Sequence, residues 1–386
     1  MDFVKERLNI PYIKLKFVVH FPGGAPLPED KVSALRGGMG EVLLCQHCVS
    51  DRKCPDCYFQ DTCIVRMTMY TMMKKRPAFM QGDDSVGYLL ECEDRRTWLG
   101  PDDELCFYLI LFGRNIEYFS LYLNAFYQLG FRGIGKGAQQ FGILRIETEE
   151  RKLLLSGNNV TMQYFKIHTL EEYARRRLRQ LKKRAQIPAA ADRRKQATMP
   201  VRDLSSAAQP VQSGAPLGNF NAEQQRPSGN QTNSAGINTP TGRTAVSGTG
   251  EASSPAGSSN CRIVFHSPLS LKYQGQFIRS FSAEAILPAL FRRIQMLDYF
   301  TENYLDSPNP EAFPPVRSQH AFPCELRRYS STQDKHITMH GIKGEIILEE
   351  VPEDLLVYLL AGELLHIGKN TSFGFGRYRV ELLPDF

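Results

Sequence analysis

Apolar and polar positions alternate with the two-residue period of a β-strand at the start of two long stretches of the chain. These segments are KLKFVVHFP (residues 14–22) and CRIVFHSPLSLK (residues 261–272). Each is followed by a loop and by a segment with helical spacing, LPEDKVSALRGGMGEVLL (residues 27–44) and FSAEAILPALFRRIQMLDYF (residues 281–300). Because strands repeat every two residues and helices every 3.6, the pattern predicts a strand followed by a helix in both stretches.

The remainder of each stretch repeats a second pattern. Segments 104–113 (ELCFYLILFG) and 343–351 (KGEIILEEV) read as strands, and segments 117–130 and 353–368 read as apolar helices, the first of them closed by Gly130. A glycine-rich loop and an alternating strand end both stretches. This order predicts an α+β fold of two tandem ferredoxin-like (RRM-like) domains, each with an antiparallel sheet under two helices, and it indicates an internal duplication.

A change in composition separates the two stretches. From Gln196 to Asn260 the chain is made of Ser, Ala, Gly, Gln, Asn, Thr and Pro with few other residues, and Phe220 is its only aromatic residue. Such a segment cannot bury enough apolar surface to offset the entropy lost on ordering. We therefore predict an N-terminal domain over residues 1–188, a flexible, disordered linker over residues 189–260 and a C-terminal domain over residues 261–386.

Length and composition agree with this division. A chain of 386 residues exceeds the usual size of one hydrophobic core, and 42% hydrophobic with 23% charged residues is typical of globular proteins. The N-terminal sequence lacks the apolar segment of a signal peptide, and no later stretch is apolar enough to cross a bilayer. These features predict a cytoplasmic protein without a membrane partner.

Positive charge is concentrated in one segment. Lys and Arg total 47 against 41 Asp and Glu, a net charge of +6. Between Arg175 and Lys195, however, ten cationic residues accompany a single acid, Asp192. Apolar residues recur at helical spacing here, so residues 169–186 are predicted to form an amphipathic helix with its cations exposed. Phosphate binding and an ordinary solvated helix face both remain open for this helix.

Five of the nine cysteines lie between Cys45 and Cys63. Such clustering suits a metal site in a reducing compartment better than a disulfide framework. The motif CPDC forms a knuckle, with one further cysteine on each side, and four thiolates satisfy a tetrahedral zinc ion. An iron-sulfur cluster and free thiols are the alternatives. The predicted ligands of a structural zinc ion are Cys48, Cys54, Cys57 and Cys63.

Glycine and lysine recur together near the end of each stretch. Lys136 lies among Gly133, Gly135 and Gly137, and Lys369 lies among Gly368, Gly374 and Gly376. Glycines leave backbone N–H groups open to a polyanion, although the same residues also serve tight turns with positive φ. A nucleotide-binding P-loop is excluded because Gly137 replaces the Ser or Thr that would bind magnesium and because a strand follows the motif.

The second stretch resembles a known family. HIGKNTSFGFGRYRVEL, CRIVFHSPLSLKYQGQ and ALFRRIQMLDYF are similar to the C-terminal domain of the CRISPR-associated repeat-processing endoribonucleases, members of the repeat-associated mysterious protein (RAMP) superfamily. LRGGMG (residues 35–40) with the cysteine cluster resembles their N-terminal part more loosely. The resemblance implies binding of a CRISPR repeat RNA hairpin and metal-independent cleavage by a ribose 2′-hydroxyl, which leaves a 2′,3′-cyclic phosphate and a 5′-hydroxyl. No cofactor is then expected for catalysis.

This chemistry needs a general base, a general acid and a cation near the phosphate. His366 and Lys369 lie at the second glycine-rich loop, and His366 would be either catalytic or a packed residue at a helix end. His47 competes with it, because the family's active histidine commonly lies on or after the first helix. The residues expected to bind RNA are Arg36, Arg132, Gly135, Lys136, His266, Gly374, Gly376, Arg377 and Arg379.

A second hypothesis uses the same folds without cleavage. In it the chain is a non-catalytic RAMP subunit that binds guide RNA within a CRISPR interference complex. For the nuclease, subunits of such an effector complex are possible partners besides the repeat hairpin. The sequence does not identify the repeat that is recognised.

Overall fold

A computed structural model of the chain describes residues 3–70, 72–80, 85–135, 137–157, 159–185, 257–307, 312–330 and 335–384. We call the described residues up to 185 the first half and those from 257 the second half. The predicted linker lies outside the described residues, except for residues 257–260. Of these four, Ser258–Asn260 already belong to the first strand of the second half.

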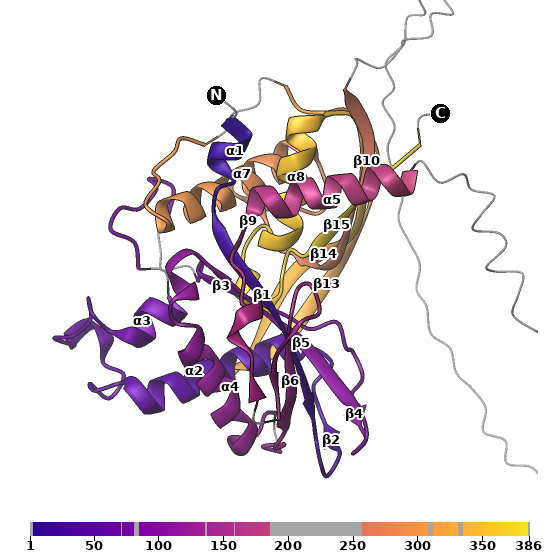
Figure 1. Ribbon diagram of the computed structural model, residues 1–386. Coiled ribbons are helices and arrows are strands. Elements are labelled where there is room, and N and C mark those ends of the chain that lie inside the picture. The colour runs from indigo at the N-terminus through magenta and orange to yellow at the C-terminus, as the bar shows by residue number, and fades with distance from the viewer. Residues whose placement is uncertain are drawn as a thin grey trace, which may run out of the picture. The chain divides into compact units, whose positions relative to one another are not determined.

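The first half contains five helices and nine strands among its described residues (Figure 1). The helices are α1 (Phe3–Arg7), α2 (Lys31–His47), α3 (Ile64–Met69), α4 (Phe119–Arg132) and α5 (Leu170–Ala185). The strands are β1 (Pro11–His20), β2 (Ala25–Pro26), β3 (Tyr88–Glu91), β4 (Trp98–Leu99), β5 (Glu104–Phe112), β6 (Gly142–Thr148), β7 (Leu153–Ser156), β8 (Asn159–Val160) and β9 (His168–Thr169).

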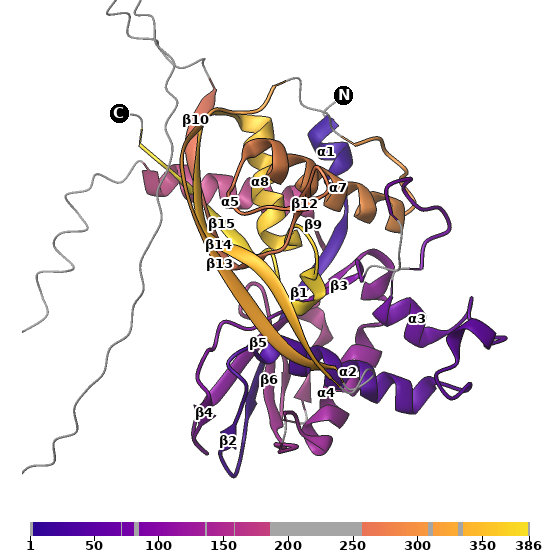
Figure 2. The same cartoon turned by 180° about the vertical axis from the view of Figure 1, so that it is seen from behind.

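The second half is shorter and has fewer elements. Its strands are β10 (Ser258–Leu269), β11 (Lys272–Tyr273), β12 (Gln276–Phe277), β13 (Val316–Ser330), β14 (Lys335–Pro352) and β15 (Tyr378–Leu382). Its helices are α7 (Ala283–Phe300) and α8 (Glu353–Leu365). Strands β13 and β14 form a long antiparallel hairpin, which Figure 2 shows running from the level of β10 down to the level of α2.

The two sheets repeat one strand order. In the first half the order is β3-β5-β1-β6, continued at one edge by β7 and β8, and in the second half it is β13-β14-β10-β15. When the four strands of each order are taken in chain order, the first lies between the third and the fourth, and all pairings are antiparallel. With helices after the first and third strands, each half has the β-α-β-β-α-β order of the split βαβ arrangement.

Local sequence explains where the helices start and stop. The Asp30 carboxylate accepts a hydrogen bond from the Val32 N–H and caps α2, and the Ser282 hydroxyl caps α7 through the Ala285 N–H. Helix α4 does not end at Gly130, where the sequence placed its end. It continues to Arg132 and is capped by Gly133, which has a φ of 83°. A Cβ at Gly130 would lie 2.4 Å from the Phe141 carbonyl oxygen, so Gly130 allows close packing and does not end the helix.

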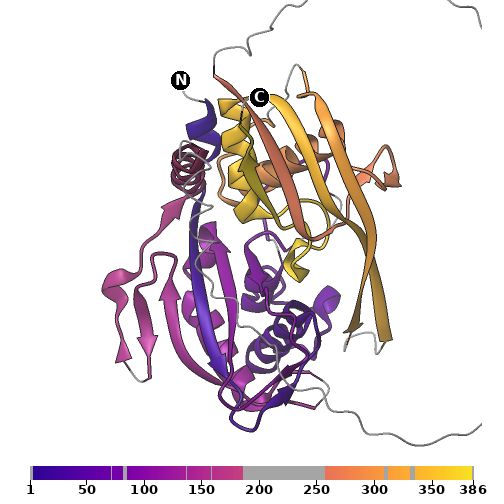
Figure 3. The ribbon, with the colours of Figure 1, turned by 90° about the vertical axis from the view of Figure 1, so that its right-hand side faces the viewer.

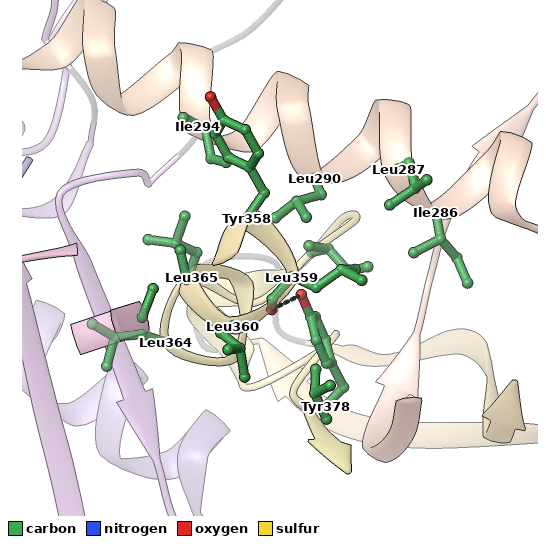
Figure 4. Close-up of a cluster of buried hydrophobic side chains, with 14 of the residues drawn as sticks. Ile286, Leu287, Leu290, Ile294, Tyr358, Leu359, Leu360, Leu364, Leu365 and Tyr378 are labelled. Carbon is green, nitrogen blue, oxygen red and sulfur yellow. Dashed lines mark hydrogen bonds between the residues drawn. The ribbon is translucent and has the colours of Figure 1, made fainter. Parts of the chain in front are cut away.

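Apolar residues of both halves share one core. One buried cluster combines Leu8, Ile10 and Phe112 of the first half with residues of β10, α7 and α8, while a second cluster lies within the first half. Figure 4 shows α7 and α8 packed through Leu290 and Leu359, with the Tyr378 hydroxyl donating to the Leu359 carbonyl at 2.7 Å. The described residues of both halves accordingly belong to one compact unit.

Helix α5 belongs to the first half in sequence but packs on the second. It lies beside α8 in Figures 1 and 3, and Arg177 donates to the buried Glu363 carboxylate through Nε at 2.8 Å. Other cations of α5 pair with Glu171, Glu149 and Glu353. The structure has the predicted helix over Leu170–Ala185. Four of its cations, Arg175, Arg176, Arg177 and Lys182, pair with carboxylates, and Arg179, Lys182, Lys183 and Arg184 are exposed as the sequence predicted.

Among the described residues, no helix combines the length and the apolar character that crossing a membrane requires.

Candidate nucleic-acid interface

The second glycine-rich loop joins α8 to β15 and is held in a single tight path. Gly374 and Gly376 have φ values of 82° and 72°, which lie in the left-handed region that favours glycine. A Cβ at Gly376 would stand 1.8 Å from the Ile367 carbonyl oxygen. Turn geometry therefore accounts for Gly376 directly, and its role in RNA binding stays a prediction, as does that of Gly374.

This loop packs against the first half. His366 Nε2 lies 3.0 Å from Glu91 Oε1 at the end of β3, and Arg377 pairs with Glu93 just beyond it. Arg36 of α2 donates from Nε to the Ser372 hydroxyl at 3.2 Å. The loop is thus placed by contacts with α2 and β3.

His366 is the most enclosed of the proposed catalytic residues. Its side chain is fully buried, its backbone φ is 56°, and its Nδ1 has no hydrogen-bond partner in the described part of the chain. Burial lowers the pKa of His366 more than the nearby Glu91 carboxylate raises it, so the ring is neutral at pH 7. In this arrangement RNA cannot reach the imidazole, and the residue can act only through the position of the loop unless the contact with Glu91 opens.

Glu91 is the charged centre of this contact. It accepts a hydrogen bond from Lys14 Nζ at 2.6 Å, and its side chain is 5% exposed. Burial alone would raise the pKa of Glu91, but the Lys14 ammonium and the contact with His366 outweigh it and hold the pKa well below its usual range. Glu91 and Glu93 were not singled out from the sequence. The sequence feature that could have indicated Glu91 is its place as an acidic residue at the end of the apolar segment YLLE.

The proposed RNA-binding residues of the second half differ in access. Lys369 and His266 are exposed, whereas Arg377 and Arg379 form ion pairs with Glu93 and Glu363. Burial lowers the pKa of His266, and Arg377 and Arg379 lower it further. RNA binding by these four residues stays a prediction, and Lys369 is exposed without an ion pair to a described carboxylate.

The first glycine-rich loop, Gly133–Gly137, is only partly described. Lys136 lies outside the described residues. Arg132 and Gly135 are exposed, and Gly135 has a φ of 74°. Among the described residues, no hydrogen bond or ion pair joins this loop to the second glycine-rich loop, so the sequence symmetry of the two loops does not by itself make one site.

A comparison with protein-family models finds a match in the second half. The family model of the CRISPR-associated endoribonuclease Cas6 matches residues 263–378, which run from β10 to the first residue of β15. Residues 263–378 form a Cas6-family domain. A second family model, described as an N-terminal domain, matches residues 10–167. The search of curated proteins found no match.

Solved structures of Cas6 proteins are also similar to this chain. A partial Cas6-RT-Cas1–Cas2 complex shares 8% identity with a TM-score of 0.47, over 97% of this chain and 46% of that one. Thermus thermophilus Cas6 shares 10% identity with a TM-score of 0.41, over 97% and 99%. A Cas6-related protein from Pyrococcus furiosus shares 9% identity with a TM-score of 0.35, over 97% and 100%. The chain spans less than half of the first two chains it matches, and the family match alone supports the function proposed below.

The cysteine cluster lies in the first half, outside the Cas6-family domain. One cavity is lined by Cys48, Cys54, Cys57 and Cys63 together with His47, whose Nε2 is buried and has no partner within the residues that the structure describes. Among the described residues, however, no three His, Cys, Asp or Glu side chains are arranged to hold a metal ion. As placed here, the four thiols do not fit zinc, and the predicted knuckle is not confirmed.

Zinc binding by the four cysteines therefore stays a prediction, and metal analysis of the purified protein checks it. We expect close to one zinc per chain, lost when Cys54 and Cys57 are both replaced by serine, because two ligands cannot hold the ion tightly. Cys261→Ser is the matched control, since Cys261 is buried in the second half. A wild-type protein without bound metal would show that the cysteines are free thiols.

Proposed function

We propose that this chain is an endoribonuclease that binds CRISPR repeat RNA and cuts precursor transcripts into guide RNAs. The observation that carries the proposal is the Cas6 family match over residues 263–378. The repeated strand order, which suits two tandem ferredoxin-like halves, supports it. The proposed partner is the repeat hairpin, and subunits of a CRISPR effector complex are further candidates.

The proposed reaction needs no metal ion. The ribose 2′-oxygen attacks the adjacent phosphorus as a base removes its proton, and the bond to the 5′-oxygen breaks as an acid protonates that oxygen. The products are a 2′,3′-cyclic phosphate and a 5′-hydroxyl, so atoms and charge balance without a co-reactant. A histidine suits proton transfer at neutral pH, and a cation, for which Lys369 is the candidate, would stabilise the phosphorane.

Of the two candidate histidines, we propose His47 as the group that transfers a proton. It ends α2, is partly exposed and lines the cavity among the cysteines, whereas His366 is fully buried against Glu91. We assign His366 a positioning role, because its contact with Glu91 joins the glycine-rich loop to β3. Direct catalysis by His366 would require that contact to open.

Cleavage of a structured repeat RNA in EDTA tests the reaction. We expect a cyclic phosphate product, and we expect a single 2′-deoxy substitution at the cleaved position to stop cutting. His47→Ala should lower the cleavage rate about a hundredfold with little change in RNA affinity, which is the usual contribution of a general acid or base. His366→Ala should also weaken RNA binding, because it releases the loop. His320→Ala, an exposed histidine on β13, is the control.

The outcomes separate the assignments. If His47→Ala cuts at the wild-type rate while His366→Ala is inactive with unchanged affinity, His366 is the catalytic residue. If both variants cut normally, neither histidine transfers the proton. RNA that stays intact with the wild-type chain across candidate repeats would overturn the nuclease proposal.

A non-catalytic RAMP subunit is the second candidate. The burial of His366 favours it, because the histidine nearest the second glycine-rich loop is then unavailable as an acid or base. This candidate predicts tight binding of the repeat RNA with no cleavage at any pH, and the same incubation distinguishes it from the nuclease.

A further inference from the structure

Three elements that are distant in sequence meet at one aromatic ring. The guanidinium carbon of Arg36, on α2, lies over the Phe373 ring at 4.1 Å from its centroid. The guanidinium carbon of Arg328, on β13, lies over the same ring at 4.4 Å. Phe373 itself ends the short 3-10 helix Thr371–Phe373 in the second glycine-rich loop. We call these residues the Arg36–Phe373–Arg328 cluster.

The cluster concentrates positive charge without an acidic partner. The two guanidinium carbons are no more than 8.5 Å apart, the sum of their distances to the centroid. Neither arginine forms an ion pair with a described carboxylate, and the Arg328 Nε is buried with no hydrogen-bond partner. Burial lowers the pKa of Arg328, and Arg36 lowers it further. Two like charges therefore repel across this site, and an anion that contacts both guanidinium groups would relieve the repulsion.

The arginines that follow the loop differ from this cluster because each of them has an ion-paired carboxylate. Arg377 and Arg379, which the sequence analysis proposed for RNA binding, form ion pairs with Glu93 and Glu363. The β13–β14 hairpin, which carries Arg328, also carries Lys335 and Lys343, and its Glu325 is paired with His340. The local charge thus favours a polyanion over a neutral or cationic partner.

We propose that the Arg36–Phe373–Arg328 cluster binds a backbone phosphate of the RNA strand, an inference that rests on the proposed function. Guanidinium groups match the geometry of phosphate oxygens, and the ring holds the plane of each one while N–H groups other than Arg36 Nε, which donates to Ser372, point to a phosphate. A phosphate there would join α2 to the hairpin, so the strand would lie across both halves. Phe373 acts as a positioning residue for the two cations.

Equilibrium RNA binding by the full chain tests the inference. The probe is a labelled repeat RNA with a 2′-deoxy nucleotide at the cleaved position, titrated at several salt concentrations. Arg328→Gln and Arg36→Gln should each weaken binding about tenfold, and each should reduce the slope of log affinity against log salt by about one, the effect of one lost phosphate contact. Arg327→Gln is the matched control, because adjacent strand residues face opposite sides of the sheet. It should change affinity less than about twofold.

The outcomes distinguish this inference from the proposed function. If both Arg328→Gln and Arg36→Gln bind like Arg327→Gln while the wild type cleaves, the cluster does not contact RNA and the nuclease proposal stands. Binding with the expected losses but no cleavage of an all-ribose RNA supports the cluster and overturns the nuclease. A wild type that binds no RNA at low salt overturns both.

Two further measurements guard against indirect effects. Thermal unfolding checks that each variant is folded, and Phe373→Leu should weaken binding several-fold while leaving the salt slope unchanged, because both charges remain. Polyglutamate that displaces the RNA from wild type but not from Arg328→Gln at equal charge concentration would assign the cluster to acidic proteins instead, and would overturn the phosphate assignment.

Discussion

Replacing Glu363 by glutamine should lower the free energy of unfolding by about 3–5 kcal/mol, the usual cost of breaking a buried ion pair by removing one partner. The Glu363 carboxylate is 0% exposed and accepts hydrogen bonds from Arg177, Arg379, the Tyr173 hydroxyl and the Val380 N–H. Glutamine keeps the shape but turns an NH₂ group toward these donors and leaves the two guanidinium groups without a counter-charge. Urea unfolding of the full chain measures the change.

Glu353→Gln is the matched control for this substitution. Glu353 lies on the same helix and also pairs with a cation of α5, Lys182, but both side chains are 47% exposed. An exposed ion pair contributes at most about 1 kcal/mol, so this variant should unfold nearly like the wild type. Equal losses for the two variants would show that burial of Glu363 does not determine the strength of the α5–α8 contact.

Replacing Asp298 by asparagine should remove much of the pH dependence of stability between pH 5 and pH 8. Asp298 lies on α7 with 1% of its surface exposed, and its Oδ1 has no hydrogen-bond partner among the described residues. Burial raises the pKa of Asp298 from 3.8 to about 7, more than Arg7 lowers it.

The sign of the effect follows from the raised pKa. The neutral carboxyl is favoured in the folded state, so its contribution is fully present below about pH 4 and is lost as pH rises through 7. At about 1.4 kcal/mol per pH unit, the wild type should lose roughly 2–3 kcal/mol between pH 5 and pH 8 from this group alone. Asp298→Asn should show a correspondingly flatter profile and higher stability at pH 8.

Asp306→Asn provides the comparison for the second prediction, because Asp306 is exposed shortly after the same helix. It should follow the wild-type profile from pH 5 to pH 8. A wild type whose stability rises over this range by the same amount as that of Asp298→Asn would show that Asp298 is ionised in the folded protein.

The spacing of apolar residues predicted the helices and strands that bury one face in the core. Strands β1 and β5 and helices α2 and α8 appear where alternation or helical spacing placed them, because burial of one face imposes the pattern. Strand β13 was not predicted. It lies at a sheet edge, includes Pro323 and is largely exposed, so neither alternation nor an apolar run marks it.

The candidate site was predicted only in part. The sequence analysis proposed Arg36 and the second glycine-rich loop, and the two are in contact through Ser372. It did not propose Arg328, which lies on the unpredicted strand β13. The burial of His366 depends on Glu91, 275 positions away in the chain. Contacts of this kind follow from tertiary packing, which a local pattern does not encode.

The shared core limits which parts of this protein can be removed or exchanged. Leu8, Ile10 and Phe112 are buried with residues of α7 and α8, so neither half keeps a complete interior when the other is taken away. Each would expose an apolar face of the kind that drives aggregation. A fusion or swap that exchanges one half should therefore carry its counterpart as well, so that the shared interior stays covered.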